Sequence, residues 1–273
     1  MNFREKLEGA QERNHSLLCI GLDPQRELLP VGDVVQFHRA IIEATQDLVS
    51  AYKPNLAFYE ALGLEGLRAL EETLKAIPSH IPVIGDAKRG DVGPSARAYA
   101  RALFEVWGFD AATVNPYFGY DALRPFLEYQ QKGVFLLART TNLGGRDFQA
   151  LYVSTASGNY QLYEVVALKA REWNRYGNIG LVAGATFPQE LKRLRALCPE
   201  MLFLAPGIGA QGGDLAQAVA GGIDSSGKGL ILSTSREVLY ATRGPDFATR
   251  SRRMAQGLRD QINALVAASQ AAR

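Results

Sequence analysis

The stretch Ile81-Pro-Val-Ile-Gly-Asp-Ala-Lys-Arg-Gly-Asp91 is the most informative part of the chain, because an apolar run is followed at once by two carboxylates and an ammonium. The run Ile81 to Gly85 has the composition of a buried strand. Residues two apart in a strand lie on the same side, so Asp86 and Lys88 are expected to point together into whatever the strand end borders. For these residues alone, a solvated turn with an incidental ion pair is the alternative interpretation.

The same strand pattern recurs along the whole chain. Short apolar, mostly β-branched runs alternate with longer segments of helical period, which is typical of buried parallel strands joined by helices. The other predicted strands are Leu17–Leu22, Ala51–Lys53, Ala111–Val114, Val134–Ala138, Ile179–Ala183, Met201–Ala205 and Leu230–Ser233. Eight strands, each followed by at least one helical turn, favour a single (β/α)8 TIM-barrel domain over residues 1–273. A doubly wound open sheet is the alternative, because periodicity counts strands without closing them.

Composition excludes several classes of protein. The 273 residues carry 30 Lys and Arg against 28 Asp and Glu, so the charge gives no reason to expect a nucleic-acid or membrane partner. The amino-terminal Met1–Arg13 is charged rather than signal-like, and no stretch approaches the roughly 18 apolar residues of a bilayer span. The chain is therefore expected to be cytoplasmic. Cys19 and Cys198 are expected as reduced core thiols, and the three histidines show no metal-ligand spacing, so no metal site is expected.

Polar residues gather where the predicted strands end. In a barrel the active site is built at the carboxyl ends of the strands. The polar residues at these ends are Asp23, Lys53, Asp86, Lys88, Asn115, Arg139 and Thr141. Their concentration on one rim predicts a shared site. The segment 142–159 is unusually long and contains Gly144 and Gly145, so it is expected to be an ordered active-site loop insertion rather than a domain.

The loops after the seventh and eighth strands suit an anion. Pro206-Gly-Ile-Gly-Ala-Gln-Gly-Gly213 is rich in glycine, and Ser233-Thr-Ser-Arg236 also precedes a helical turn. Glycines let backbone N–H groups approach an oxyanion, helix amino termini favour negative charge, and Arg236 supplies a bidentate donor. Barrels commonly hold phosphate at these two loops. The predicted substrate is a phosphorylated small molecule.

These motifs lie within a resemblance that covers nearly the whole chain. The blocks that carry it are Gly-Leu-Asp-Pro at 21–24, Lys-Pro-Asn-Leu-Ala-Phe-Tyr-Glu at 53–60, Asp-Ala-Lys-Arg-Gly-Asp at 86–91, Thr-Val-Asn-Pro-Tyr at 113–117 and Pro-Gly-Ile-Gly-Ala-Gln-Gly-Gly at 206–213. With them the chain resembles the orotidine 5′-phosphate decarboxylase family, specifically its longer, mainly bacterial subgroup (type 2). The Asp-x-Lys-x-x-Asp core alone is shared with related sugar-phosphate lyases.

The resemblance implies specific roles for residues. Lys53, Asp86, Lys88 and Asp91 fall on the family's charged catalytic array. Asp91, together with Ser95, would reach into the active site of a partner subunit, so a homodimer with shared sites is implied. The implied substrate-binding residues are Asp23 at the ribose, Thr141 at the pyrimidine, Pro206, Ser235, and Gln211 and Arg236 at the phosphate. The run Thr141-Asn-Leu-Gly departs from the family's usual Ser-Asn-Pro-Gly: the hydroxyl group is kept and the proline is lost.

The activity that the resemblance implies is the conversion of orotidine 5′-phosphate to UMP and CO₂ in pyrimidine biosynthesis, without metal or cofactor. Lys88 would stabilise a carbanion at C6 of the pyrimidine and then donate its proton. Two alternatives stay open. One is a magnesium-dependent lyase of the same barrel family, such as a hexulose-phosphate synthase or a keto-gulonate-phosphate decarboxylase, and the other is a catalytically silent nucleotide-phosphate binding protein.

Overall fold

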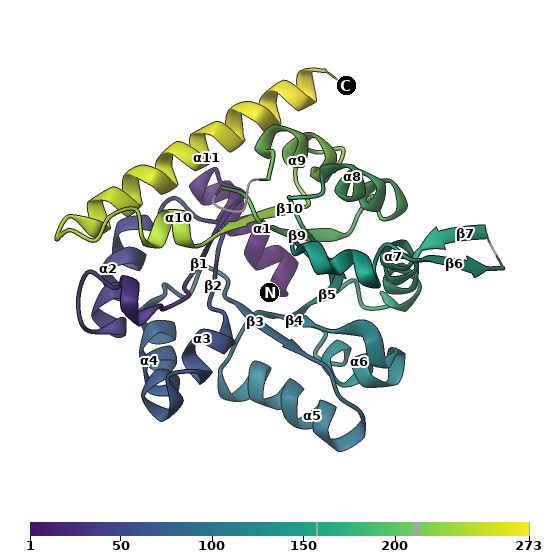
Figure 1. Ribbon diagram of the computed structural model, residues 1–273, viewed down its shortest axis with the longest axis horizontal. Helices are drawn as coiled ribbons and strands as arrows, with labels where there is room; N and C mark the ends of the chain where they lie inside the picture. The colour runs from purple at the N-terminus through teal and green to yellow at the C-terminus, as the bar shows by residue number, and fades with distance from the viewer. Residues whose placement is uncertain (157, 210–212, 273) are drawn as a thin grey trace.

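Eight parallel strands form a closed ring with helices around it (Figure 1). The computed structural model describes residues 1–156, 158–209 and 213–272, and within them the strand order is β2-β1-β10-β9-β8-β5-β4-β3. The strands are β1 (Leu18–Gly21), β2 (Ala51–Lys53), β3 (Ile84–Arg89), β4 (Ala111–Val114), β5 (Gly133–Arg139), β8 (Ile179–Ala183), β9 (Leu202–Pro206) and β10 (Leu230–Thr234). The predicted (β/α)8 barrel is confirmed, and the open-sheet alternative is wrong.

The ring closes between β2 and β3, where the pairing is reduced to two isolated bridges. Tyr52 pairs with Val83, and Asn55 pairs with Asp86. The backbone N–H of Asp86 donates to the carbonyl of Pro54 at 3.0 Å. We call this junction the β2–β3 seam. It lies directly beside two of the predicted site residues, Lys53 and Asp86.

The third strand was predicted to end at Gly85, and that boundary is wrong. β3 continues through Asp86 to Arg89, and its pairing with β4 shifts register between Gly85 and Arg89. Lys88 lies in the irregular part, with a backbone φ of 49°. A pattern of apolar residues cannot reveal a strand that continues through charged residues, because these face a cavity instead of the core.

Helices cover the outside of the ring and bury apolar faces against it. The helices that follow the strands are α2 (Val34–Thr45), α3 (Leu56–Glu60), α4 (Gly63–Ala76), α5 (Gly93–Arg101), α6 (Tyr120–Leu127), α7 (Leu162–Trp173), α8 (Pro188–Leu197), α9 (Leu215–Gly222), α10 (Arg236–Leu239) and α11 (Phe247–Ala271). Side chains cap several of them: Asp33, for example, accepts from the Gln36 amide at the start of α2, at 2.6 Å. None of the helices among the described residues combines the length and hydrophobicity that a bilayer crossing requires.

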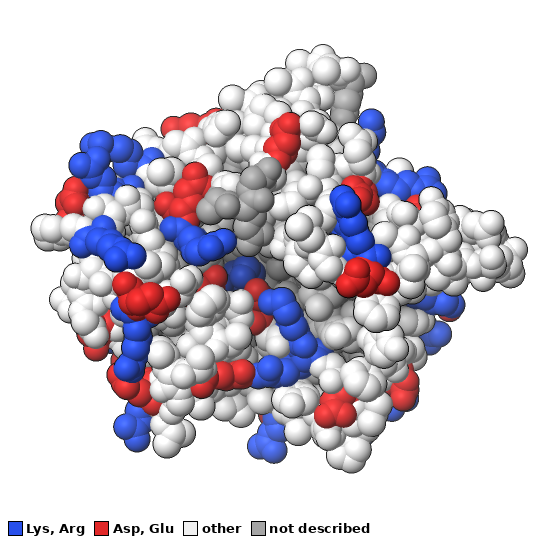
Figure 2. Space-filling model, in the orientation of Figure 1, with Lys and Arg blue, Asp and Glu red and all other residues white. Residues whose placement is uncertain are grey.

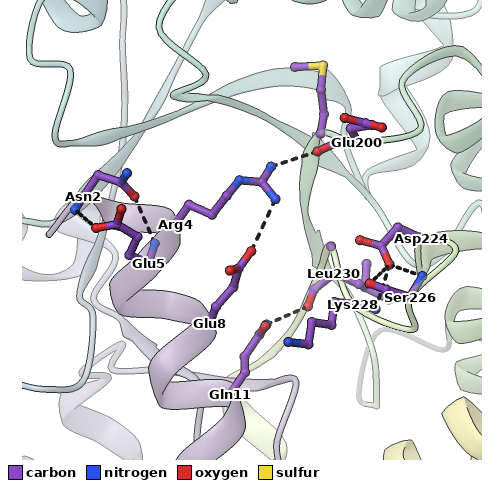
Figure 3. A network of polar contacts seen from close by, with 12 residues as sticks. Asn2, Arg4, Glu5, Glu8, Gln11, Glu200, Asp224, Ser226, Lys228 and Leu230 are labelled. Carbon is purple, nitrogen blue, oxygen red and sulfur yellow. Dashed lines mark hydrogen bonds and ion pairs between the residues drawn. The ribbon is translucent and has the colours of Figure 1, made fainter.

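Helix α1 (Phe3–Asn14) closes the amino-terminal end of the barrel and lies in the middle of the strand ring in Figure 1. Phe3 packs edge-on against Phe135 of β5, with ring centroids 5.7 Å apart. Polar side chains of α1 bond to the main chain beside β9 and β10 (Figure 3). Arg4 donates to the Glu200 carbonyl at 2.8 Å, and Gln11 donates to the Leu230 carbonyl at 3.3 Å. Helix α1 therefore covers this end of the barrel, and the predicted site residues Lys53, Asp86 and Lys88 lie at the opposite end.

The segment 142–159 is more structured than an irregular loop. It contains a 3₁₀ turn, Leu143–Asp147, followed by the antiparallel strands β6 (Tyr152–Thr155) and β7 (Gly158–Gln161). The hairpin projects outward beyond α7 (Figure 1). Gln149 ties the base of the segment to the end of β5, because its side chain accepts from the Thr140 amide at 3.0 Å and donates to the Thr140 hydroxyl at 2.8 Å.

Candidate active site

A cavity of about 460 Å³ opens at the carboxyl ends of the strands. Each of the eight strands, or the loop that follows it, contributes lining residues. Figure 2 shows a hollow in the centre of the face viewed in Figure 1, with both acidic and basic side chains around it. Of the predicted site residues, this cavity brings together Asp23, Lys53, Asp86, Lys88, Thr141, Pro206, Ser235 and Arg236.

Asp86 is the centre of the charged cluster in the cavity. One of its oxygens accepts from Lys53 Nζ at 2.9 Å. The other accepts from Lys88 Nζ at 2.6 Å and from the hydroxyl of Thr113 at 2.9 Å. Asp86 and Lys53 are buried, whereas the Lys88 side chain is 49% exposed. The arrangement leaves one ammonium partly open to a bound molecule and holds the other against the wall.

Both buried charges are kept in the ionised form. Burial alone would raise the pKa of Asp86, but the Lys53 and Lys88 ammonium groups reverse this effect and hold that pKa well below its ordinary value. Burial alone would likewise lower the pKa of Lys53, yet the negative charges of Asp86 and Asp23 raise it above its ordinary value. The cavity floor therefore carries a carboxylate and an ammonium at neutral pH, close to any group bound above them.

Asp23 fixes the next part of the wall. Its carboxylate accepts from the backbone N–H of Asn55 at 3.2 Å, and its backbone carbonyl accepts from the hydroxyl of Tyr240 at 2.8 Å. The same Tyr240 hydroxyl accepts from the backbone N–H of Gln25 at 2.8 Å. The carboxylate of Asp23 is thereby held at the cavity wall, where it can accept from a hydroxyl of a ligand.

The opposite end of the cavity is suited to an anion. The Ser235 hydroxyl is buried there and has no hydrogen-bond partner among the described residues. No described carboxylate forms an ion pair with the exposed Arg236 guanidinium beside it. Gly21 lets β1 approach this corner, since a Cβ at that position would lie 2.9 Å from the Cβ of Ser235. Gln211, predicted to hold the phosphate with Arg236, lies outside the described residues.

Thr141 lies at the cavity wall as predicted, despite its departure from the family's usual serine. Thr186 donates to its backbone carbonyl at 3.3 Å, and Gly184 packs against its methyl group. Arg139 and Asn115, also expected on the rim, do not line the cavity. Arg139 is 1% exposed and stacks on the ring of Phe187 at 3.6 Å instead.

Asp91 and Ser95 do not line the cavity of this chain either. Asp91 accepts from its neighbour, the Val92 amide, at 2.8 Å, just before α5. Ser95 is exposed on the first turn of α5. Within one chain, therefore, three of the four residues of the predicted charged array come together, and Asp91 does not join them.

Sequence reasoning missed several residues of the site. Thr113 holds Asp86, and Asn55 holds Asp23. Leu137, Val182 and Leu204 add an apolar section to the wall. The predicted strand Ala111–Val114 places Thr113 near the rim but does not indicate its contact with Asp86. The apolar residues gave no indication of a site, because they belong to ordinary hydrophobic strands.

The described residues that line the cavity include two carboxylates, Asp23 and Asp86, as candidate ligands for a metal ion. Among the residues that the structure describes, no three His, Cys, Asp or Glu side chains are grouped so as to hold a metal ion. Both oxygens of Asp86 already accept from ammonium groups, which would repel a divalent cation.

Comparisons with known proteins agree with this geometry. Residues 16–250 match the family described as "Orotidine 5'-phosphate decarboxylase / HUMPS family". An orotidine 5′-phosphate decarboxylase of Dehalococcoides mccartyi is 52% identical over 264 residues, which are 96% of this chain and 98% of that protein. The structure of Leishmania donovani OMP decarboxylase matches with a TM-score of 0.87 and 42% identity, covering 97% of this chain and 99% of that one.

A longer protein of the same organism also matches. The structure of Leishmania donovani UMP synthase has a TM-score of 0.88 and 43% identity to this chain, which spans 57% of that protein's length. The family model and the identity to several named decarboxylases cover nearly all of the present chain. The resemblance found in the sequence motifs is confirmed, and the chain belongs to the orotidine 5′-phosphate decarboxylase / HUMPS family.

Proposed function

We propose that the protein converts orotidine 5′-phosphate to UMP and CO₂, with Lys88 beside the carbon that loses its carboxylate. The observation that carries this proposal is the Lys53–Asp86–Lys88 cluster in a cavity whose other end offers Ser235 and Arg236 to a phosphate. The decarboxylase names of relatives that are 52% identical support it. The direct test is to incubate the protein with orotidine 5′-phosphate and follow the formation of UMP. Failure to form UMP would refute the proposal.

The geometry suggests how the reaction proceeds. With the phosphate at Arg236 and the ribose at Asp23, the pyrimidine lies over the charged cluster and near Thr141. The bond from C6 to the carboxylate breaks, its electron pair stays on C6, and CO₂ leaves toward the apolar wall formed by Leu137, Val182 and Leu204. The Lys88 ammonium stabilises the carbanion and then transfers a proton from Nζ to C6. Neutral Lys88 regains its proton from solvent.

Asp86 has two roles in this scheme. Its ionised carboxylate holds both ammonium groups, at 2.9 Å from Lys53 and 2.6 Å from Lys88. It also lies close to the position of the departing carboxylate, and the repulsion between the two negative charges is relieved as neutral CO₂ forms. Binding of the remote phosphate offsets this repulsion in the complex.

A magnesium-dependent lyase is the second candidate, because the matched family description also includes HUMPS proteins. The ammonium groups around Asp86 argue against it, since they occupy both oxygens that a cation would use. We therefore expect full decarboxylase activity in excess EDTA. Loss of activity in EDTA, restored by added Mg²⁺, would favour the lyase.

We also propose a homodimer in which Asp91 and Ser95 of each chain enter the partner's cavity. Large apolar side chains are exposed on the loops and helices after β3 and β4: Val92, Tyr99, Val106, Tyr117 and Phe118. Exposed apolar groups of this kind mark an interface. The test mixes two inactive variants, Lys88→Ala and Asp91→Ala, under subunit exchange. Shared sites would restore about a quarter of the wild-type activity, because half of the dimers are mixed and each carries one intact site. No restored activity despite exchange would refute the shared site.

The insertion 142–159 is proposed to act in the site through its base, since Gln149 holds Thr140 next to Thr141.

We propose that the whole chain works as one barrel domain in the cytoplasm. Limited proteolysis tests the single-domain proposal. One cooperative, protease-resistant core is expected, and early cleavage into stable halves would contradict it. Cell fractionation tests the location.

A further inference from the structure

We propose that Thr113 is a positioning residue whose hydroxyl group joins Asp86 to the main chain of Lys88 and so fixes where the Lys88 ammonium lies. This inference rests on the proposed function and adds to it the device that aims the proton donor. Thr113 lies on β4 and is 1% exposed.

The direction of each hydrogen bond at Thr113 is determined by its partners. The Lys88 backbone N–H can only donate, and it lies 3.0 Å from Thr113 Oγ1. The hydroxyl therefore accepts from Lys88 and uses its one proton to donate to Asp86 Oδ1, at 2.9 Å. The same Asp86 oxygen accepts from Lys88 Nζ at 2.6 Å. The result is a closed ring of hydrogen bonds in which both the backbone and the side-chain end of Lys88 are held through one threonine.

The backbone of Lys88 needs this support. Its φ of 49° lies in the left-handed region, which is costly for a residue with a Cβ and persists only where the surroundings hold it. The β3–β4 pairing shifts register between Gly85 and Arg89, so the regular ladder does not provide the partner of the Lys88 amide. The Thr113 hydroxyl provides it. A valine would fill the same space in a buried strand but would offer no hydroxyl group.

Loss of the hydroxyl should therefore affect the chemical step more than binding. Arg236 and Ser235, at the far end of the cavity, do not depend on Thr113. We expect Thr113→Val to lower kcat about 10- to 100-fold, the usual effect of removing a hydrogen bond to a charged group. KM and the affinity for UMP should stay within about threefold of wild type, and Thr113→Ser should restore kcat to within about threefold.

The experiment compares the wild type, Thr113→Val, Thr113→Ser and the control Thr45→Val, which also loses a buried hydroxyl but lies on α2 away from the cavity. If Thr113→Val does not fold, Thr113→Ala makes the same comparison. Unchanged kcat in the variant without a hydroxyl, or equal loss in Thr113→Ser, would overturn the inference. Crystal structures of the variants provide a readout without activity: Lys88 should leave its left-handed conformation in Thr113→Val and keep it in Thr113→Ser. A wild type without decarboxylase activity would refute the proposed function, whereas these structures would still test the positioning.

Discussion

Replacing Lys88 by alanine should abolish turnover and leave the fold almost unchanged. The substitution removes one ion pair, Lys88 Nζ to Asp86 Oδ1, from a side chain that is 49% exposed. The Asp86 end of the pair is only 11% exposed, so we expect a contribution to the free energy of unfolding at the upper end of the range of about 0–1 kcal/mol for exposed pairs. Asp86 keeps its bonds to Lys53 and Thr113, each 2.9 Å long, so no buried charge is left without a partner.

The expected change in melting temperature follows from that figure. About 1 kcal/mol corresponds to roughly 2–4 °C for a chain of this size. Lys88→Gly should be at least as stable as Lys88→Ala, because the left-handed φ of 49° is strained for alanine and not for glycine. Both variants should lose at least about 10⁴-fold in kcat, since the proposed proton donor and its positive charge disappear together.

The assay measures UMP formation by chromatography and the melting temperature by calorimetry on the same samples. Lys75→Ala is the matched control: this lysine on α4 is 58% exposed and forms ion pairs with Glu71 and Glu72, each at 2.9 Å. The control should lose little stability and no turnover. Turnover by Lys88→Ala above about one per cent of wild type would refute the role of Lys88 as proton donor. A melting temperature lowered by far more than about 4 °C would refute the stability argument.

Three further results are expected. Asp86→Asn should destabilise the protein by about 3–5 kcal/mol, because two ammonium groups, one of them buried, lose their counter-charge; a loss below about 1 kcal/mol by denaturant unfolding would contradict this. The pKa of Asp86 is lowered in the folded state, so its contribution to stability is present above its unfolded value near 3.8 and is lost as the pH falls further; melting curves between pH 6 and 2 should show a steeper acid decline for wild type than for Asp86→Asn. Arg236→Ala should raise KM about 10- to 100-fold at nearly constant stability, whereas Arg175→Ala, an exposed arginine at the closed end of the barrel, should leave KM unchanged.

The sequence allowed the barrel to be predicted because each strand is an apolar run that the helical segments interrupt. Ala51–Lys53, Ala111–Val114 and Ile179–Ala183 have the predicted bounds. The end of β3 could not be found in this way, since Asp86 and Lys88 extend the strand while facing the cavity. The hairpin of β6 and β7 was also missed. Its strands bury none of their described residues, so their sequence shows no alternation of apolar and polar residues that would indicate a strand.

The charged part of the site was predictable because position along a strand determines which rim a residue reaches. Lys53, Asp86 and Lys88 meet there as expected. The contacts that support the site were not predictable. Thr113 bonds to Asp86 and Asn55 to Asp23 across neighbouring strands, and a single sequence does not reveal which side chains meet there. The prediction that Arg139 belongs to the site was wrong. The strand pattern gives its position at the rim, but it does not show that the side chain stacks on the ring of Phe187.

The β2–β3 seam gives the charged cluster a mechanical importance besides its chemistry. Lys53 and Asp86 belong to the two strands that share only isolated bridges, so their ion pair fastens the barrel where its backbone pairing is sparsest. Any local opening at this junction would pull apart Lys53 and Asp86, two residues of the proposed catalytic cluster. Heat or denaturant should thus inactivate the protein while most of the barrel is still intact, and sequence changes that strengthen this one junction would prolong its working life more than equal gains elsewhere.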